Sequence, residues 1–166
     1  MQNHMTSTSR RTNPTSHDPQ RPLHPAKLPS VDTAAILFLR FALGCTFLSA
    51  VADRFGFWGA PGQHNVAWGN WTHFVAYTAQ VNRFLPSATA PFLAGLATSL
   101  EILFGVGALI GFHPRLVAVG SAILLLFFAT AMAFSFGLKS PLDASVFVDA
   151  AAAFLWFVME DRKRRT

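Results

Sequence analysis

The chain has 166 residues, enough for about one domain, and it carries a net charge of +5. Hydrophobic residues make up 52% and charged residues only 13%, against ~25% charged residues in an average soluble domain. This composition argues against a soluble globular enzyme. The single cysteine, Cys45, excludes a disulfide scaffold, a paired-cysteine redox motif and a cysteine-based zinc site within the chain. We expect no nucleic-acid partner, because the positions of the basic residues are better explained by a membrane.

The polar and apolar residues divide the chain into three parts. Residues 1–30 are rich in Ser, Thr, Pro, His and Arg and have almost no large apolar side chains, so we expect a disordered cytoplasmic tail. Residues 31–160 hold the apolar sequence and are expected to form one transmembrane domain. Residues 161–166 are expected to form a basic cytoplasmic tail.

Four apolar stretches follow one another in the central part, at residues 33–52, 90–112, 116–136 and 142–159. Each has about the ~20 residues that a helix needs to cross a bilayer. The sequence therefore predicts an all-α fold, an integral membrane four-helix bundle surrounded by lipid. A His-Pro-Arg turn at 113–115 makes a hairpin of the second and third helices. Gly137 is expected to end the third helix, Ser140 to cap the fourth and Pro141 to lie in its first turn.

The long connection between the first two helices, residues 53–87, is rich in aromatic side chains. Its interfacial anchors are Trp58, Trp68, Trp71 and Tyr77, because Trp and Tyr prefer the membrane surface. A short interfacial helix is expected at about residues 70–83. Two alternatives stay open for this segment, a simple anchoring belt and a lid over a cavity.

The basic residues predict the orientation of the bundle. Nine of the thirteen Lys and Arg residues lie in the N-terminal segment, the 113–115 turn or the C-terminus, and three lie in the other connections. The excess places both termini in the cytoplasm. Residues 50–52 resemble a signal-peptidase site, but the first apolar stretch is longer than a signal core and contains Arg40, so we expect no cleavage.

Three charged side chains fall within the predicted spans and form a candidate buried polar pocket. A charge at mid-membrane costs at least ~2.5–3.5 kcal/mol, so such residues are usually paired or functional. Counting from the helix ends places Arg40 and Glu101 at depths that differ by only ~6 Å, and we expect them to pair. Asp149, with Ser145 one turn before it, completes the pocket. The alternatives are a purely structural bridge, or an Arg40 that reaches the headgroups while Glu101 is protonated.

Further polar residues give weaker signals. Asp53, Arg54 and Lys139 are expected to form an outer-face cluster near Asp149. His64 and His73 lie among aromatic residues but lack an acidic partner, so we expect no metal site. Gly107 and Gly111 have the spacing of a close helix contact, and we expect them to serve packing within the bundle.

Several short motifs, in their order and spacing, resemble the DoxX family of small bacterial membrane proteins. The resemblance covers about residues 31–160 and rests on Leu39-Arg40-Phe41-Ala42-Leu43-Gly44, Asp53-Arg54-Phe55-Gly56, Trp68-Gly69-Asn70-Trp71, Ala97-Thr98-Ser99-Leu100-Glu101 and Ser140-Pro141-Leu142-Asp143-Ala144-Ser145-Val146-Phe147. It implies a four-helix inner-membrane bundle and carries the family's intramembrane Arg and Glu over to Arg40 and Glu101.

No nucleophile–base arrangement, phosphate loop or haem-attachment motif is present in the sequence. The expected function is a non-catalytic membrane subunit or partner of a redox system for sulfur or thiol compounds, with a quinone as candidate cofactor and an oxidoreductase as candidate partner. The resemblance also allows a subunit of a thiosulfate:quinone-type oxidoreductase, and Glu101 and Asp149 allow a small proton-coupled carrier. Self-association is left open.

Overall fold

The computed structural model describes residues 30–165, and these residues fold into four long helices with shorter elements between them. The long helices are α1 (Val31–Arg54), α3 (Ala90–Ile110), α4 (Pro114–Phe136) and α6 (Val146–Arg165). The shorter ones are α2 (Trp71–Val81), the 3-10 turn η1 (Ser87–Thr89) and α5 (Lys139–Asp143). No strand occurs between residues 30 and 165. The expected tail at 1–29 lies outside the described residues.

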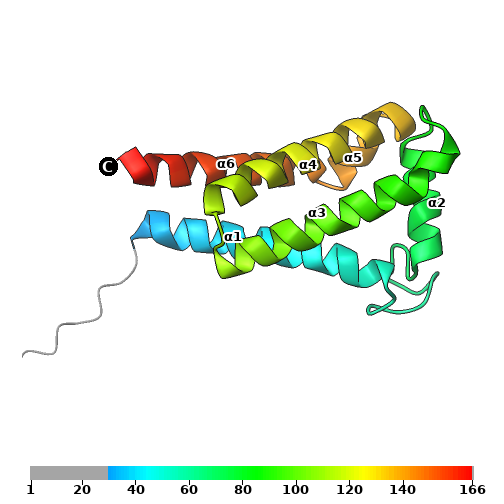
Figure 1. The fold of residues 1–166 in the computed structure, drawn as a ribbon, viewed down its shortest axis with the longest axis horizontal. Helices are drawn as coiled ribbons and strands as arrows, with labels where there is room; N and C mark the ends of the chain where they lie inside the picture. Colours follow the sequence, from blue (N-terminus) through cyan, green and yellow to red (C-terminus); the bar gives the residue numbers. More distant parts are fainter. Residues whose placement is uncertain (1–29, 166) are drawn as a thin grey trace, which may run out of the picture.

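The long helices run back and forth along one axis (Figure 1). α1 packs against α3, α4 packs most extensively against α6, and α3 also contacts α4. The start of α1 and the end of α6 lie at one end of the bundle, which we call the terminal end. Helix α2 lies across the opposite end, which we call the α2 end.

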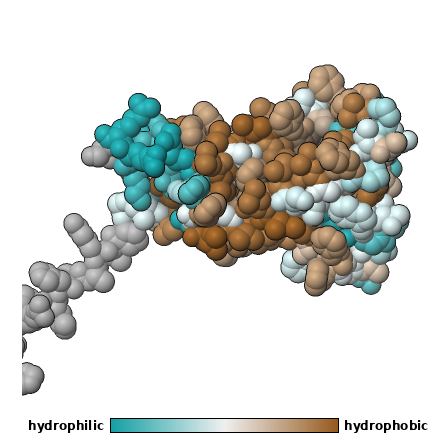
Figure 2. Space-filling view, viewed as in Figure 1, coloured by the Kyte–Doolittle hydropathy of each residue, from teal (hydrophilic) through white to brown (hydrophobic). Residues whose placement is uncertain are grey.

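Three of the helices, Val31–Arg54, Ser87–Ile110 (η1 with α3) and Pro114–Phe136, are long and apolar enough to cross a membrane. Large apolar side chains such as Phe38, Phe92, Phe127 and Phe134 are exposed on them. On the face seen in Figure 2, apolar side chains cover the middle of the bundle, between more polar ends. A surface of this kind suits contact with lipid rather than with water, so the structure suggests a membrane protein.

The helix ends follow from local chemistry. Ser30 caps α1, accepting a hydrogen bond from the Thr33 N–H at 3.3 Å. Asn70 caps α2 in the same way, accepting from the His73 N–H at 2.9 Å. Gly111 ends α3 with a φ of 76°, in the left-handed region that glycine enters without strain. Pro114 begins α4, where its missing N–H removes no intrahelical bond.

The fourth apolar stretch differs from its prediction. Ser140 and Pro141 lie inside the short helix α5 instead of capping the next long helix. The chain then turns at Ser145, whose φ is 57°, and α6 begins at Val146. Residues 161–165 continue α6, whose last turn is basic. Because charged residues fill its final third, α6 is not among the three spanning candidates, and its crossing stays a prediction.

The helices pack closely where small residues meet. A Cβ added to Gly44 on α1 would lie 3.1 Å from the Gly105 carbonyl oxygen and 2.8 Å from the Leu109 side chain. A Cβ on Gly107 would lie 2.9 Å from Val117 of α4, which agrees with the expected packing role of Gly107. On α6, Trp156 is fully buried and donates its indole N–H to Glu160 at 3.3 Å. The close contact of Gly44 with Gly105 and Leu109 fixes the α1–α3 register that positions the polar residues.

Candidate functional site

A buried ion pair joins α1 to α3 near the α2 end. Arg54, the last residue of α1, pairs through Nη1 with the Glu101 carboxylate in the middle of α3. The two residues are only 2% and 3% exposed. Arg54 Nη1 also donates to Thr98 Oγ1 at 2.8 Å, and Thr98 in turn donates to the Ala94 carbonyl at 2.8 Å. Two opposite charges compensate each other here, as burial of either requires.

Aromatic rings from the long connection cover the same guanidinium group. The Arg54 Cζ atom lies 3.8 Å from the centre of the Phe74 ring and 5.2 Å from that of Trp68. Both are within the range of a cation–π interaction. Trp68 also packs edge-on against Phe74, with centroids 5.0 Å apart. Arg54 therefore binds the α2 segment to the bundle as well as pairing with Glu101.

Asp53, the residue before Arg54, holds the loop that precedes α2. Its Oδ2 atom accepts hydrogen bonds from the backbone N–H groups of Ala67 and Trp68, at 3.0 and 2.8 Å. At the far end of α2, the buried Ser135 of α4 donates to the Val81 carbonyl. Helix α2 and the loop before it are thus held on both sides, and Trp68 is kept beside Arg54.

The predicted pair between Arg40 and Glu101 is wrong. Arg40 Nε instead donates to the Ala108 carbonyl at 2.9 Å, and its Nη2 donates to the Leu109 carbonyl at 3.4 Å. These are carbonyls at the C-terminus of α3, where a cation also meets the negative end of the helix dipole. Arg40 therefore caps α3 and does not belong to the buried pocket.

The helix register explains this correction. Helices α1 and α3 are antiparallel, and Gly44 faces Gly105. Arg40, one turn before Gly44 on α1, therefore lies beside Leu109, one turn after Gly105 on α3. Glu101 lies one turn from Gly105 in the other direction, toward Arg54. The predicted pair rests on the depths of Arg40 and Glu101 counted from the ends of their helices. Such a count assumes that the ends of the two helices lie at the same level. It also assumes that the first helix stops at Ala52, whereas α1 continues to Arg54.

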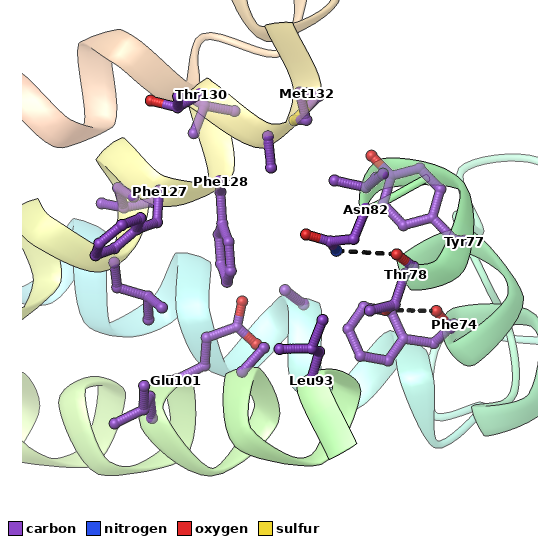
Figure 3. A pocket seen from close by; sticks show the side chains of 18 of the residues that line it. Phe74, Tyr77, Thr78, Asn82, Leu93, Glu101, Phe127, Phe128, Thr130 and Met132 are labelled. Carbon is purple, nitrogen blue, oxygen red and sulfur yellow. Dashed lines mark hydrogen bonds between the residues drawn. The ribbon is translucent and has the colours of Figure 1, made fainter. Parts of the chain in front are cut away.

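The ion pair lies in the wall of a large cavity of about 1380 Å³ near the α2 end. In Figure 3 the Glu101 carboxylate points from α3 into the space beneath Phe128 of α4. Residues of α2 close one side, with Thr78 donating to the Phe74 carbonyl and the Asn82 amide donating to the Thr78 carbonyl. Most of the remaining lining is apolar and includes Phe47, Leu93, Leu96, Leu100, Leu124, Leu125, Phe127, Met132 and Phe134.

The cavity reaches the surface of the bundle. Leu96 of α3 and Phe127 and Phe134 of α4 line it and are also exposed, as is Phe84 after α2. In a bilayer, such a surface on the three spanning candidates would face acyl chains. The cavity therefore opens between α3 and α4 toward the side on which lipid would lie.

The other residues of the predicted pocket and outer-face cluster separate in the structure. Asp149 of α6 lines the same cavity as Glu101, whereas Ser145 is exposed and is not among the lining residues. Lys139 pairs with Asp143 one turn later on the surface of α5. The expected cluster of Asp53, Arg54 and Lys139 is therefore not formed.

The four predicted aromatic anchors divide between two environments. Trp68 and Tyr77 line the cavity, together with Phe74. Trp58 is exposed and donates to the Ser49 carbonyl at 3.0 Å, and Trp71 stacks on Phe55 at the surface. The Tyr77 hydroxyl, protonated at neutral pH as in any tyrosine, can donate a hydrogen bond, and burial raises the pKa of this phenol further.

Residues 30–165 contain no group of three or more His, Cys, Asp or Glu side chains that could hold a metal ion. His73 contacts the Trp68 carbonyl at 3.2 Å, and His64 is exposed. The Cys45 side chain is exposed on α1.

Sequence reasoning missed three parts of the site: the role of Arg54 as partner of Glu101, the contacts of Phe74 with Arg54, and the polar pair Thr78 and Asn82. Arg54 could have been found, because no helix-breaking residue separates it from the first apolar stretch. The α2 residues carry no comparable sequence signal. No known family model, curated protein or solved structure matches the chain.

Proposed function

We propose that this protein is a small membrane protein that holds an amphipathic molecule of quinone type, drawn from the bilayer, in the cavity between α3 and α4. Its role would be that of a non-catalytic membrane subunit or partner of a redox system. The observation that carries the proposal is the cavity itself. It is large, mostly apolar, open toward lipid and lined by a few polar groups, as ligand sites usually are.

The polar groups suit a neutral headgroup with carbonyl oxygens. The Tyr77 hydroxyl and the Asn82 amide can donate hydrogen bonds at the α2 side of the cavity. The charge of Arg54 is compensated by Glu101, so this wall offers polarity without a net charge. An aromatic headgroup would lie among Trp68, Phe74 and Phe128, where offset ring contacts are favourable.

The proposal places the chain in the DoxX family, in a bacterial inner membrane, with α6 as a fourth crossing and both termini in the cytoplasm. The resemblance supports this assignment through the Asp53-Arg54 and Thr98–Glu101 motifs, because these residues form the cavity wall and its loop contact. The basic last turn of α6 and the start of α1 lie at the same end of the bundle, which supports the orientation.

A second candidate function is a proton-coupled carrier. It is favoured by one observation, that the carboxylates of Glu101 and Asp149 line the same cavity. Such a carrier would show electrogenic uptake in proteoliposomes, and this uptake would be lost in Glu101→Gln.

The test of the main proposal is to extract the protein gently from its own membrane and measure quinone per protein chain. Ala97 lines the cavity, so Ala97→Phe fills part of the space, whereas Ala151→Phe adds the same ring to an exposed position on α6. We expect near-stoichiometric quinone in the wild type and in Ala151→Phe. In Ala97→Phe we expect about a tenfold loss, because an overfilled site cannot relax fully.

Two outcomes would refute the proposal. The wild type could carry only phospholipid, or Ala97→Phe could retain as much quinone as Ala151→Phe. A co-purifying oxidoreductase in the same preparation would support the role in a redox system and identify the partner.

A further inference from the structure

The charges that line the cavity do not balance in its interior. Arg54 and Glu101 neutralise each other, and Arg83, the other lining cation, is exposed at the mouth after α2, where water compensates its charge. The second carboxylate, Asp149, is half-buried on α6. Its side chain has no ion pair or hydrogen bond to any residue in the described range 30–165. The interior therefore carries one uncompensated acidic group.

The Glu101 carboxylate lies in the same lining, although Arg54 compensates its charge. It points into the cavity (Figure 3), and its Oε2 atom has no hydrogen-bond partner apart from the ionic contact with Arg54. The lining therefore holds carboxylates from α3 and α6, and of these only Glu101 is paired with a cation. In apolar surroundings, such charges act over longer distances than they do in water.

We infer that Asp149 is a specificity-determining residue that makes the cavity exclude anionic amphipaths and favour cationic ones, with neutral ones between. The inference rests on the proposed function, since it assumes that an amphipath enters the cavity. Bilayers are rich in acyl chains with acidic heads, which would otherwise compete for an apolar cavity open to lipid. A like charge inside the cavity rejects them through repulsion and through the loss of their hydration.

Three probes with the same tail and different heads test this selectivity: dodecylamine, dodecanol and dodecanoate. Retention of each radiolabelled probe is measured on nanodiscs of phosphatidylcholine that hold the protein, after subtraction of retention on empty discs. At a pH of about 8.5 the amine is protonated and the acid ionised. We expect the amine to bind at least about tenfold more tightly than the acid, with the alcohol between them.

Matched variants assign the effect to Asp149. In Asp149→Asn we expect the difference between amine and acid to shrink to about twofold, and in Asp149→Glu to persist. Asp143→Asn makes the same change at an exposed carboxylate on α5 that does not line the cavity, and it should leave the order intact.

The outcomes separate the inference from the proposal on which it rests. Retention of none of the three probes by the wild-type protein would overturn the proposed binding function and the inference with it. Equal retention of all three, or unchanged selectivity in Asp149→Asn, would overturn the inference alone. Equal retention of the amine and the acid by the wild-type protein overturns the inference even if a variant fails to fold.

Discussion

The two arginines of α1 show how the same residue type serves opposite purposes at the two ends of the bundle. Arg40, toward the terminal end, has no acidic partner among residues 30–165 and binds the carbonyls that end α3. Arg54, at the α2 end, is almost completely buried and binds a carboxylate, a hydroxyl and two aromatic rings. The first contact completes a helix terminus, whereas the second builds a cavity wall.

The packing around the two arginines differs in the same way. Between them, Gly44 and Gly105 bring α1 and α3 into close contact, and the fully buried Trp156 helps fill the core. Toward the α2 end, α3 and α4 leave the cavity between them, and the smaller helix α2 covers it. A tightly packed half thus supports an open half, in which polar groups are concentrated.

The largest expected effect on stability is that of Arg54→Leu. The substitution leaves Glu101 buried without a cation and removes the contacts with Phe74 and Trp68, so we expect a loss of about 3–5 kcal/mol. The measurement is the free energy of unfolding in a mild detergent. Lys139→Leu removes a cation from an exposed pair and should change that value by less than about 1 kcal/mol. Equal losses in the two variants would contradict the difference between a buried and a surface pair.

A smaller loss is expected for Arg40→Leu. The variant removes two hydrogen bonds to carbonyls and a favourable charge at a helix C-terminus, together worth about 1–2 kcal/mol. Hydrogen exchange should increase mainly in the last turn of α3. Faster exchange around Glu101 instead would contradict the capping role of Arg40.

The smallest expected effect is a difference between two glycine-to-alanine substitutions. It separates the cost of backbone strain from the cost of contact with Arg40. Gly111 and Gly137 both have a positive φ, but a Cβ on Gly111 would lie 2.5 Å from the Arg40 guanidinium, whereas a Cβ on Gly137 meets nothing within 4 Å. We expect Gly111→Ala to cost about 1–2 kcal/mol and Gly137→Ala about 1 kcal/mol in the free energy of unfolding. The difference should vanish when Arg40 is replaced by Leu, and a difference that persists would show that the guanidinium is not responsible.

The three membrane-spanning candidates could be predicted from the sequence, because the length of an apolar stretch is enough to identify each of them. The first three apolar stretches correspond to α1, α3 and α4, and the predicted 70–83 helix corresponds to α2. The break before α6 could not be predicted, because it depends on the left-handed turn at Ser145, a residue that rarely adopts this conformation.

The polar site was predicted less completely, for a physical reason. Glu101 and Asp149 were found because a charge inside an apolar stretch is visible in the sequence. Which cation meets Glu101 depends on the α1–α3 register, and that register is fixed by glycine contacts that depth counting ignores. The cavity itself depends on how α2 folds back across the helix ends, which no local pattern specifies.

The most direct test of the central claim, that Arg54 and Glu101 together form the cavity wall, is a double-mutant cycle on the free energy of unfolding. The cycle combines Arg54→Leu with Glu101→Leu, and a parallel cycle combines Arg40→Leu with Glu101→Leu. We expect a coupling energy of about 2–3 kcal/mol for the first pair, because the double variant leaves no unpaired charge, and less than about 0.5 kcal/mol for the second. The reverse order, with Arg40 coupled to Glu101 and Arg54 independent of it, would contradict the site.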